Sequence, residues 1–225
     1  MPGPEGREAG KRDKEVRLIV EILPVGLLQT NCYLAACPDT REAVIIDPGG
    51  NPERILEAVD KHGLTVRYVL NTHGHFDHTE ANAAVVEATA APLAAHPLEK
   101  PLLAMAGGAS FFGLPGKPGP APDRDLVPGE ELAVGTLTFQ VLYTPGHTPG
   151  HVCFYEEEQG VLFDGDVLFY RGIGRSDLPG GNPHDLIRSI REVLYSLPDE
   201  TVVYSGHGPA TTIGEEKRYN PFVRS

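Results

Sequence analysis

The feature that most constrains this chain is a run of four potential metal ligands within six residues. His73, His75, Asp77 and His78 follow an apolar segment, Val66 to Leu70, and precede an alanine-rich one. Histidine is the commonest metal ligand near neutral pH, and aspartate adds a charged oxygen. In an extended segment, residues 73, 75 and 77 would point to one side, and a helix would turn His78 toward a second centre. One short loop rarely gives four ligands to one metal, so the run predicts two metals, each completed from elsewhere in the chain.

Three further motifs supply candidates for the missing ligands. Each places a polar side chain in a glycine-containing corner after a strand-like run, and glycine permits tight corners and close backbone approach. The candidates are His147 in Pro-Gly-His-Thr-Pro-Gly, Asp166 in Asp-Gly-Asp, and His207 in Ser-Gly-His-Gly. The chain contains nine histidines, and five of them fall in the four motifs. A lone histidine is usually solvated or hydrogen-bonded, but this ensemble predicts a metal centre.

In chain order, these residues resemble the metal ligands of the metallo-β-lactamase superfamily. The matching residues are His73, His75, Asp77, His78, His147, Asp166 and His207. Asp47, which opens Asp-Pro-Gly after the strand-like run 43–46, resembles the first motif of that superfamily, whose aspartate supports the site without binding metal. The resemblance covers about Val16 to Pro221. It implies an α+β fold: a four-layer αβ/βα sandwich with two facing mixed sheets, helices outside, and the metals at one edge.

The hydrophobic pattern of the first half suits such a layered fold. Strands are expected over 16–23, 31–36, 43–46, 66–70 and 92–95. Pro24 would end the first strand. A helix would begin at Asn51-Pro52, with Asn51 as its cap, and would stop at Gly63. A second helix is expected over 81–90, with an inward face formed by Ala81, Ala84, Val85 and Ala88.

The second half repeats the arrangement of strands followed by a helix. Strands are expected over 132–134, 137–142, 152–155, 161–163 and 201–204. A helix would begin at Asn182-Pro183 and end at Pro198. Between the halves, Pro101 to Pro128 is rich in glycine and proline and is not expected to form a regular element. Phe111 and Phe112 in this loop would either close over an active site or pack into the neighbouring core.

The charge balance and the cysteines narrow the function and the location. Lys and Arg number 19 and Asp and Glu 31, so the net charge is −12. A chain this acidic lacks the basic face that binds nucleic acid. Met1 to Glu15 is charged, without an apolar signal segment, and is expected to be a disordered tail before one domain over 16–225. No segment approaches the roughly 18 apolar residues of a membrane span, and the cysteines show no metal-type pairing. We therefore expect a cytoplasmic protein with free thiols.

The resemblance implies two divalent metals, zinc or iron, and such ligands also accept manganese. The first metal would be bound by His73, His75 and His147, and the second by Asp77, His78 and His207. Asp166 would bridge them, because a carboxylate has two oxygens. A water shared between two cations loses its proton near neutral pH, and the resulting hydroxide would attack an electrophilic carbonyl. Asp77 would orient that hydroxide, so Asp77 and Asp166 are the candidate catalytic residues.

The segment after Asp166 resembles that of type II glyoxalases, the hydroxyacylglutathione hydrolases. It reads Asp166-Val-Leu-Phe and then Gly-Ile-Gly-Arg175, and a basic residue at this last position helps those enzymes hold glutathione. Arg175 would bind a substrate carboxylate through paired hydrogen bonds, or would pair with Asp177 instead. Gly208-Pro209 replaces an aromatic contact of those enzymes, and the chain ends soon after Pro221, before their longer helical segment. These features indicate the short glyoxalase II-like branch, acting on a small thiol-derived ester of the S-lactoylglutathione type.

Other functions remain open on the same residues. A persulfide dioxygenase would bind one iron through residues matching His73, His147 and Asp166. A lactonase or β-lactamase would use both metals on a ring carbonyl, but lactonases tend to carry a tyrosine where this chain has Phe169. Redox relatives with a non-hydrolytic di-iron centre have Glu where this chain has His75, which argues against them. Metal-dependent turnover of any thioester would exclude a binding module without catalysis.

The histidines outside the motifs have structural explanations. His62 falls at a helix end, where a positive charge is favourable. His96 and His184 start segments and are expected at the surface or beside the site. His151 is expected to support the turn after His147 rather than to bind metal.

Overall fold

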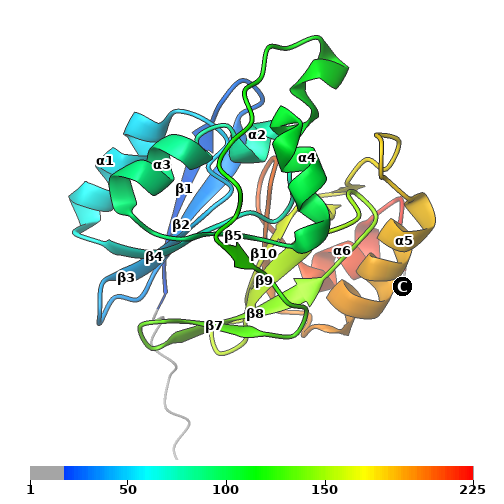
Figure 1. Cartoon of the computed structure of the whole chain (residues 1–225). Helices are drawn as coiled ribbons and strands as arrows, with labels where there is room; N and C mark the ends of the chain where they lie inside the picture. The colour runs from blue at the N-terminus through cyan, green and yellow to red at the C-terminus, as the bar shows by residue number, and fades with distance from the viewer. Residues whose placement is uncertain (1–17, 225) are drawn as a thin grey trace, which may run out of the picture.

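The computed structural model describes residues 18–224, in which two six-stranded sheets face each other with helices on both outer sides (Figure 1). The tail expected over Met1 to Glu15 lies outside the described residues, as does Val16. Each sheet contains parallel and antiparallel pairs, so both are mixed. The layers follow the order helix, sheet, sheet, helix, which confirms the predicted αβ/βα sandwich.

The first sheet is built from the first half of the chain, with its strands in sequence order. They are β1 (Ile19–Val25), β2 (Thr30–Ala36), β3 (Glu42–Ile46), β4 (Thr65–Leu70), β5 (Leu93–Ala95) and β6 (Arg124–Asp125). β1 to β3 form an antiparallel meander, and β3 to β6 run parallel. Parallel neighbours need crossovers, which here contain α1 (Pro52–His62), α2 (Phe76–Thr79), α3 (Asn82–Thr89), η1 (Pro97–Glu99), α4 (Lys100–Ala104) and η2 (Ala106–Phe112).

The second sheet is built from the second half of the chain, in the order β14-β13-β10-β9-β8-β7. Its strands are β7 (Glu131–Val134), β8 (Leu137–Tyr143), β9 (Val152–Glu156), β10 (Val161–Gly165), β13 (Val202–Ser205) and β14 (Thr211–Thr212). The short hairpin of β11 (Leu168–Phe169) and β12 (Gly172–Ile173) follows β10. The outer face is covered by α5 (Pro183–Arg188), its continuation through η3 (Ser189–Val193) and η4 (Leu194–Ser196), and α6 (Ile213–Tyr219).

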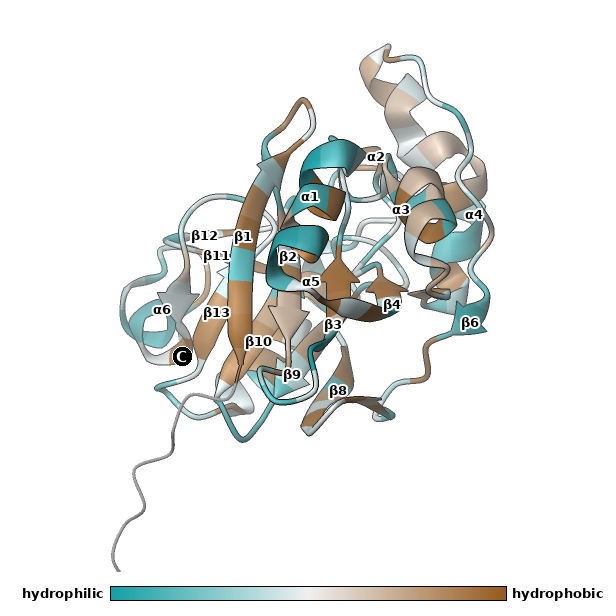
Figure 2. Ribbon diagram, turned by 90° about the vertical axis from the view of Figure 1, so that its left-hand side faces the viewer, coloured by the Kyte–Doolittle hydropathy of each residue, from teal (hydrophilic) through white to brown (hydrophobic). Residues whose placement is uncertain are grey.

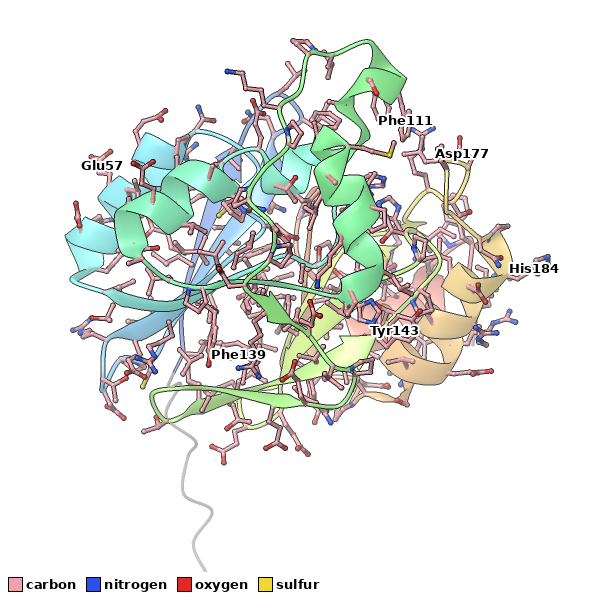
Figure 3. The ribbon with its side chains drawn as sticks, viewed as in Figure 1. Glu57, Phe111, Phe139, Tyr143, Asp177 and His184 are labelled. Atoms are coloured by element: carbon pink, nitrogen blue, oxygen red, sulfur yellow. The ribbon has the colours of Figure 1, made fainter. Side chains whose placement is uncertain are left out.

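Three apolar clusters occupy the spaces between the four layers. Successive side chains of a strand point to opposite faces, so Tyr33 of β2 packs between the sheets while Leu34 packs toward α1 and α3. Phe139 and Phe163 of the second sheet fill the space opposite Tyr33, and Figure 3 shows Phe139 in the interior. Figure 2 shows the apolar residues concentrated in the strands, while α1 turns mostly hydrophilic residues outward. Strands covered on both faces read as continuous apolar runs, which explains why the sequence pattern located them.

Two predictions, one for Pro24 and one for Asn51, differ from the structure. Pro24 does not end the first strand, which continues to Val25. β1 is an edge strand, where a residue without an N–H group costs no ladder hydrogen bond. Asn51 precedes α1 but does not cap it, because its side-chain oxygen accepts a hydrogen bond from Gly26 N at 2.9 Å instead. Gly63 ends α1 in the left-handed conformation, as predicted.

Two further predictions require correction between residues 81 and 128. In α3, Val85 and Asn82 are buried, whereas Ala84 and Ala88 are exposed. The buried Asn82 exchanges hydrogen bonds with Asn71, which decides which side of the helix faces inward. The loop over 101–128 is irregular only in part, because it contains most of α4, the short helix η2 and strand β6. Small alanine-rich turns are compatible with these short helices.

The loops at one edge of the two sheets bring distant segments together. Backbone hydrogen bonds join the sheets there: Asn31 N donates to Gly206 O at 2.7 Å, and Val152 N donates to Thr72 O at 2.9 Å. The loops that follow β4, β8, β10 and β13 all meet at this edge. In residues 18–224, no helix has the length and apolar character needed to cross a membrane.

Candidate metal centre

The seven predicted ligands converge on this edge from four loops. His73 and His75 lie between β4 and α2, and Asp77 and His78 lie within α2. The others, His147, Asp166 and His207, follow β8, β10 and β13. The predicted alternation of an extended segment is wrong for Asp77, because α2 begins at Phe76. A helical turn places Asp77 beside His78 rather than beside His75.

The first cluster consists of His73, His75 and His147, all buried. His147 Nε2 lies 2.9 Å from His75 Nδ1 and 3.2 Å from His73 Nε2. Two nitrogens bound to one tetrahedral zinc at about 2.0–2.1 Å are separated by roughly 3.3 Å. The three nitrogens therefore have the spacing of ligands around a single cation.

The second cluster consists of Asp77, His78 and His207. Asp77 Oδ2 lies 3.2 Å from His207 Nε2 and 3.5 Å from His78 Nε2. Thr30, which the sequence gave no reason to select, donates its hydroxyl to the same Asp77 oxygen at 2.9 Å. This bond comes from β2 and fixes the carboxylate in place.

Asp166 lies between the two clusters. Its Oδ1 is 3.4 Å from His78 Nε2 in the second cluster. Its Oδ2 is 3.6 Å from His147 Nε2 in the first cluster and 3.7 Å from His207 Nε2. One carboxylate thus reaches ligands of both groups, as a bridging ligand must.

The donor set fits a pair of cations by an independent criterion. Buried polar atoms nearly always have hydrogen-bond partners. Among the described residues, five buried side-chain atoms have no such partner: His78 Nε2, Asp166 Oδ1, Thr148 Oγ1, Asp164 Oδ1 and Thr201 Oγ1. The first two lie at the metal centre. They belong to predicted ligands and lie 3.4 Å apart. A bound cation would satisfy both atoms, so the residues present are suited to hold metal.

Hydrogen bonds to the outer ring nitrogens orient the imidazoles. His147 Nδ1 donates to the carbonyl of Arg175 at 2.7 Å, and His73 Nδ1 donates to Thr72 Oγ1 at 3.0 Å. His78 Nδ1 donates to Asp47 Oδ2 at 2.9 Å. A ring that carries its proton on Nδ1 keeps the Nε2 lone pair for a metal. All three inward-facing Nε2 atoms are therefore in the form that coordinates a cation.

Asp47 contacts the ligands from behind. Its Oδ1 accepts a hydrogen bond from Thr72 N at 2.8 Å, and its Oδ2 accepts one from Thr72 Oγ1 at 2.6 Å as well as that from His78. Asp47 also forms a compact group with His73 and His78. Because its oxygens already accept these donors, the geometry favours a supporting role over metal binding, the role that the family resemblance implies.

Glu99 is a site residue that the sequence did not reveal. It is only 1 % exposed, and burial raises the pKa of its carboxyl group. Its Oε2 accepts a hydrogen bond from Gly74 N and its Oε1 one from Gly150 N, each at 2.7 Å. Gly74 separates His73 from His75, and Gly150 belongs to the loop of His147. Glu99 therefore joins the two loops that form the first cluster, and no motif signals this.

The histidines outside the clusters are accounted for. His151 Nδ1 donates to Thr144 Oγ1 at 3.0 Å, and its Nε2 accepts from Asp166 N at 3.2 Å. It thus positions the bridging aspartate and belongs to none of the candidate metal groups found among residues 18–224. His96 stacks on Tyr143, and His62 pairs with Glu21. His184 lies on α5 and points away from the site (Figure 3).

The two clusters differ in their affinity for protons. Burial, together with neighbouring imidazoles, lowers the pKa of His73 and brings that of His75 to about 3, and burial also lowers the pKa of His147. Burial alone would lower the pKa of His78 and His207 too, but the carboxylates of Asp166 and Asp77 raise both. Protons therefore compete with a metal more strongly at the second cluster.

A pocket of about 360 Å³ opens over both clusters. Its walls are mostly apolar and include Leu28, Phe76, Phe112, Phe169, Ile173 and Leu178. Arg175 also lines it, with its Nε and Nη2 atoms each 2.8 Å from an oxygen of Asp177, and its guanidinium lies over the ring of Phe112. Phe111 and Phe112 remain partly exposed rather than entering the core. Figure 3 shows Phe111 and Asp177 on the same side of the molecule.

The chain is similar to known proteins in both sequence and structure. Residues 25–207 match the model of the metallo-beta-lactamase superfamily. The chain is 42 % identical over 209 residues to hydroxyacylglutathione hydrolase GloC of Haemophilus influenzae, covering 92 % of this chain and 98 % of that protein. The crystal structure of the B3 metallo-beta-lactamase BLEG-1 is 41 % identical, with a TM-score of 0.87, and covers 92 % of this chain and 100 % of that one.

Two further crystal structures are similar to most of this chain. The protein in the crystal structure of TTHA1623 in a di-iron-bound form is 45 % identical to this chain, with a TM-score of 0.83, and the match covers 91 % of this chain and 100 % of that one. ETHE1 from Myxococcus xanthus is 37 % identical, with a TM-score of 0.75, and the match covers 90 % of this chain and 83 % of that one.

Proposed function

The chain belongs to the metallo-β-lactamase superfamily of metallo-hydrolases, and on that premise we propose that it is a dinuclear thioester hydrolase of the glyoxalase II type. The observation that carries the proposal is the pair of ligand clusters with one carboxylate, Asp166, between them. A centre of this kind is suited to attack on an electrophilic carbonyl. The relevant substrate class is a thiol-derived ester such as S-lactoylglutathione.

Each side chain has a definite part in this proposal. One divalent metal, zinc or iron, would be held by His73, His75 and His147, and the other by Asp77, His78 and His207. Asp166 would be shared between them, and Asp47 keeps the proton of His78 on Nδ1. When bound, the two cations supply Lewis acidity: they lower the pKa of water and polarise a carbonyl oxygen.

Asp77 also orients the attacking water. Its Oδ2 already accepts a hydrogen bond from Thr30, so the remaining oxygen is available to accept a hydrogen bond from water in the pocket. Its neighbour His78 helps to lower the pKa of Asp77 to about 2, against the effect of burial. The carboxylate is therefore ionised at neutral pH and acts as an acceptor.

The substrate is proposed to bind in the pocket at the metal clusters, whose lining includes Phe112 and Arg175. Its apolar walls exclude water from the carbonyl, which strengthens electrostatic interactions there. Arg175 would receive a substrate carboxylate by exchanging it for Asp177, which it pairs with at two atoms. The likeness to GloC supports the thioester assignment.

A second candidate, a mononuclear iron persulfide dioxygenase, is favoured by one observation. ETHE1 is similar over most of the chain, and His73, His147 and Asp166 alone would hold one iron. The complete second cluster of Asp77, His78 and His207 argues for two metals instead.

Metal content together with two parallel assays separates these candidates. We expect two metals per chain and hydrolysis of S-lactoylglutathione without oxygen consumption in the presence of glutathione persulfide. Replacing Asp166 with alanine should remove metal and hydrolysis together, whereas Glu57→Gln on the exposed face of α1 should change neither (Figure 3). One iron per chain with persulfide-dependent oxygen uptake would overturn the proposal in favour of the dioxygenase.

A further inference from the structure

A second and larger pocket lies beside the one over the metal clusters. Its volume is about 640 Å³, against about 360 Å³ for the pocket at the metal clusters. It is formed by α2, the start of α3, the α4–η2 segment and residues 114–119. Neither the ligand motifs nor the proposed metal chemistry uses this space. Cavities of about 300–1,000 Å³ are the usual size for small-molecule sites.

The two pockets meet at Phe76 and at the turn between β1 and β2. Phe76 lines both pockets, and it lies between the ligands His75 and Asp77. In the adjoining turn, Leu27 lines the larger pocket and its neighbour Leu28 lines the smaller one. The two pockets therefore adjoin each other at Phe76 and at this turn.

The boundary at Phe76 is rigidly placed. A Cβ atom on Gly107 would lie 2.2 Å from Phe76 N, so the backbone of η2 packs directly on that of α2. Gly107 has φ +62°, a conformation that glycine adopts without strain. On its other side, the ring of Phe76 lies 5.7 Å from the ring of Phe112. Phe76 is thus a fixed wall shared by two compartments.

The wall chemistry indicates what the larger pocket holds. Apolar side chains outnumber polar ones in its wall: Leu27, Phe76, Leu103, Ala106, Ala109, Leu114 and Pro115, against Thr79, Glu80, Asn82 and Lys117. Leu27 is 70 % exposed and Leu28 48 % exposed, and Phe112, which lines the smaller pocket together with Leu28, is 44 % exposed. Clustered exposed apolar side chains mark binding surfaces. Most of the lining side chains are apolar, which suits a hydrocarbon chain better than a glutathione moiety with its several charges.

We propose that the larger pocket binds an extended apolar acyl chain of the substrate while the thioester carbonyl lies at the metal clusters. The proposal rests on the proposed function and names its substrate class: thioesters with a hydrocarbon acyl group longer than the metal pocket can hold. The thiol part then leaves past Arg175 and Phe112. Each additional methylene that enters the larger pocket raises kcat/KM by about fourfold, as burial of one such group implies.

The test uses acyl thioesters of a single short thiol, from acetyl to decanoyl, with the full-length metal-loaded protein. The quantity compared is the ratio of kcat/KM for decanoyl to that for acetyl. We expect a large ratio for the wild type and a fall of about tenfold in Leu27→Ala, because contacts to two or so methylenes are lost. Leu28→Ala should lower both substrates in proportion and leave the ratio unchanged. Ile22→Ala, an exposed apolar residue outside both pockets, should leave both substrates unchanged.

A second variant fills the pocket from its rim. A Cβ on Gly119 meets nothing within 4 Å, so Gly119→Phe adds a ring to the pocket lining without a clash at the backbone. It should lower the decanoyl-to-acetyl ratio at least as much as Leu27→Ala while metal content and thermal unfolding stay at wild-type values. A ratio near one in the wild type, or equal loss for both substrates in Leu27→Ala and Gly119→Phe, would overturn the proposal.

A binding measurement separates this proposal from the proposed function. Saturable binding of a fluorescent fatty acid, dansyl-undecanoic acid, is expected for the wild type and a weakening of at least tenfold for Gly119→Phe. If no thioester is hydrolysed but this binding is seen, the proposed function fails and the apolar site stands. If thioesters are hydrolysed but no saturable binding is seen, or Gly119→Phe does not weaken it, the apolar site is rejected.

Discussion

Replacing Glu99 with glutamine should weaken the first ligand cluster without touching any ligand. Each oxygen of Glu99 accepts one backbone N–H, from Gly74 and from Gly150, at 2.7 Å. Glutamine keeps the length and volume of the side chain but turns one oxygen into an NH2 group. That group faces an N–H donor in either orientation, so one glycine loses its partner in a buried position.

The magnitude follows from the bond that is lost and from the charge that is removed. A hydrogen bond to a charged group contributes about 1.5–3 kcal/mol, and the other bond becomes a neutral, weaker one. Burial raises the pKa of Glu99, so removing its charge relieves some desolvation and offsets part of the loss. We expect a net destabilisation of about 2 kcal/mol, which lowers the Tm of a chain of this size by about 4–8 °C.

Two measurements separate the effect on folding from the effect on metal binding. Thermal unfolding of the metal-free protein reports the loss of the two loop contacts. Zinc titration against a competing chelator, analysed as two sites, should show one affinity lowered about fivefold, equivalent to about 1 kcal/mol. Glu57→Gln on the exposed face of α1 is the matched control and should change neither quantity. Unchanged unfolding and unchanged zinc affinity in Glu99→Gln would refute the assignment of Glu99 to the loops.

Three other outcomes follow from the same geometry. Gly206→Ala should abolish binding of the second metal and most turnover, because a Cβ there would lie 2.3 Å from Asp166 Oδ1. A wild-type metal content, measured by elemental analysis, would contradict this. As the pH falls, protons should displace metal from the second cluster first. The reason is that neighbouring carboxylates raise the pKa of His78 and His207, whereas burial lowers the pKa of His73. Loss of both metals in a single step, measured as metal content across a pH series, would contradict this. Chelation should lower Tm by several degrees, because two cations at 100 times their Kd stabilise by about 2.7 kcal/mol each, and a Tm insensitive to chelator would exclude binding that is specific to the folded state.

The ligand set was accessible from the sequence because its chemistry is carried by residue type and short spacing. His73, His75, Asp77 and His78 are adjacent in the chain, and each remaining ligand follows an apolar strand at the same edge of the fold. The ten longer strands were also located from the sequence, since many of them are covered on both faces and give apolar runs, whereas the two-residue strands β6, β11, β12 and β14 were not predicted. The family resemblance supplied the layer arrangement that periodicity alone does not give.

The residues that escaped prediction act through tertiary contacts that leave no local pattern. Glu99 resembles any surface glutamate in the sequence, and only the fold brings Gly74 and Gly150 to its two oxygens. Thr30 reaches Asp77 across a separation of 47 residues. Asn82 overrides the apolar pattern of its helix because Asn71 lies opposite it. Each case depends on a partner that the sequence places far away.

The candidate ligands come from both sheets, so the geometry of the metal centre depends on how the two sheets pack against each other. His73 to His78 are carried by one sheet, and His147, Asp166 and His207 by the other. Metal–ligand distances tolerate changes of only about 0.2 Å. A small shift of one sheet relative to the other, at the contact between Tyr33 and Phe163, would therefore change the distances between the candidate ligands. Substitutions that change only the packing between the two sheets are therefore expected to lower turnover, although none of them touches a candidate ligand.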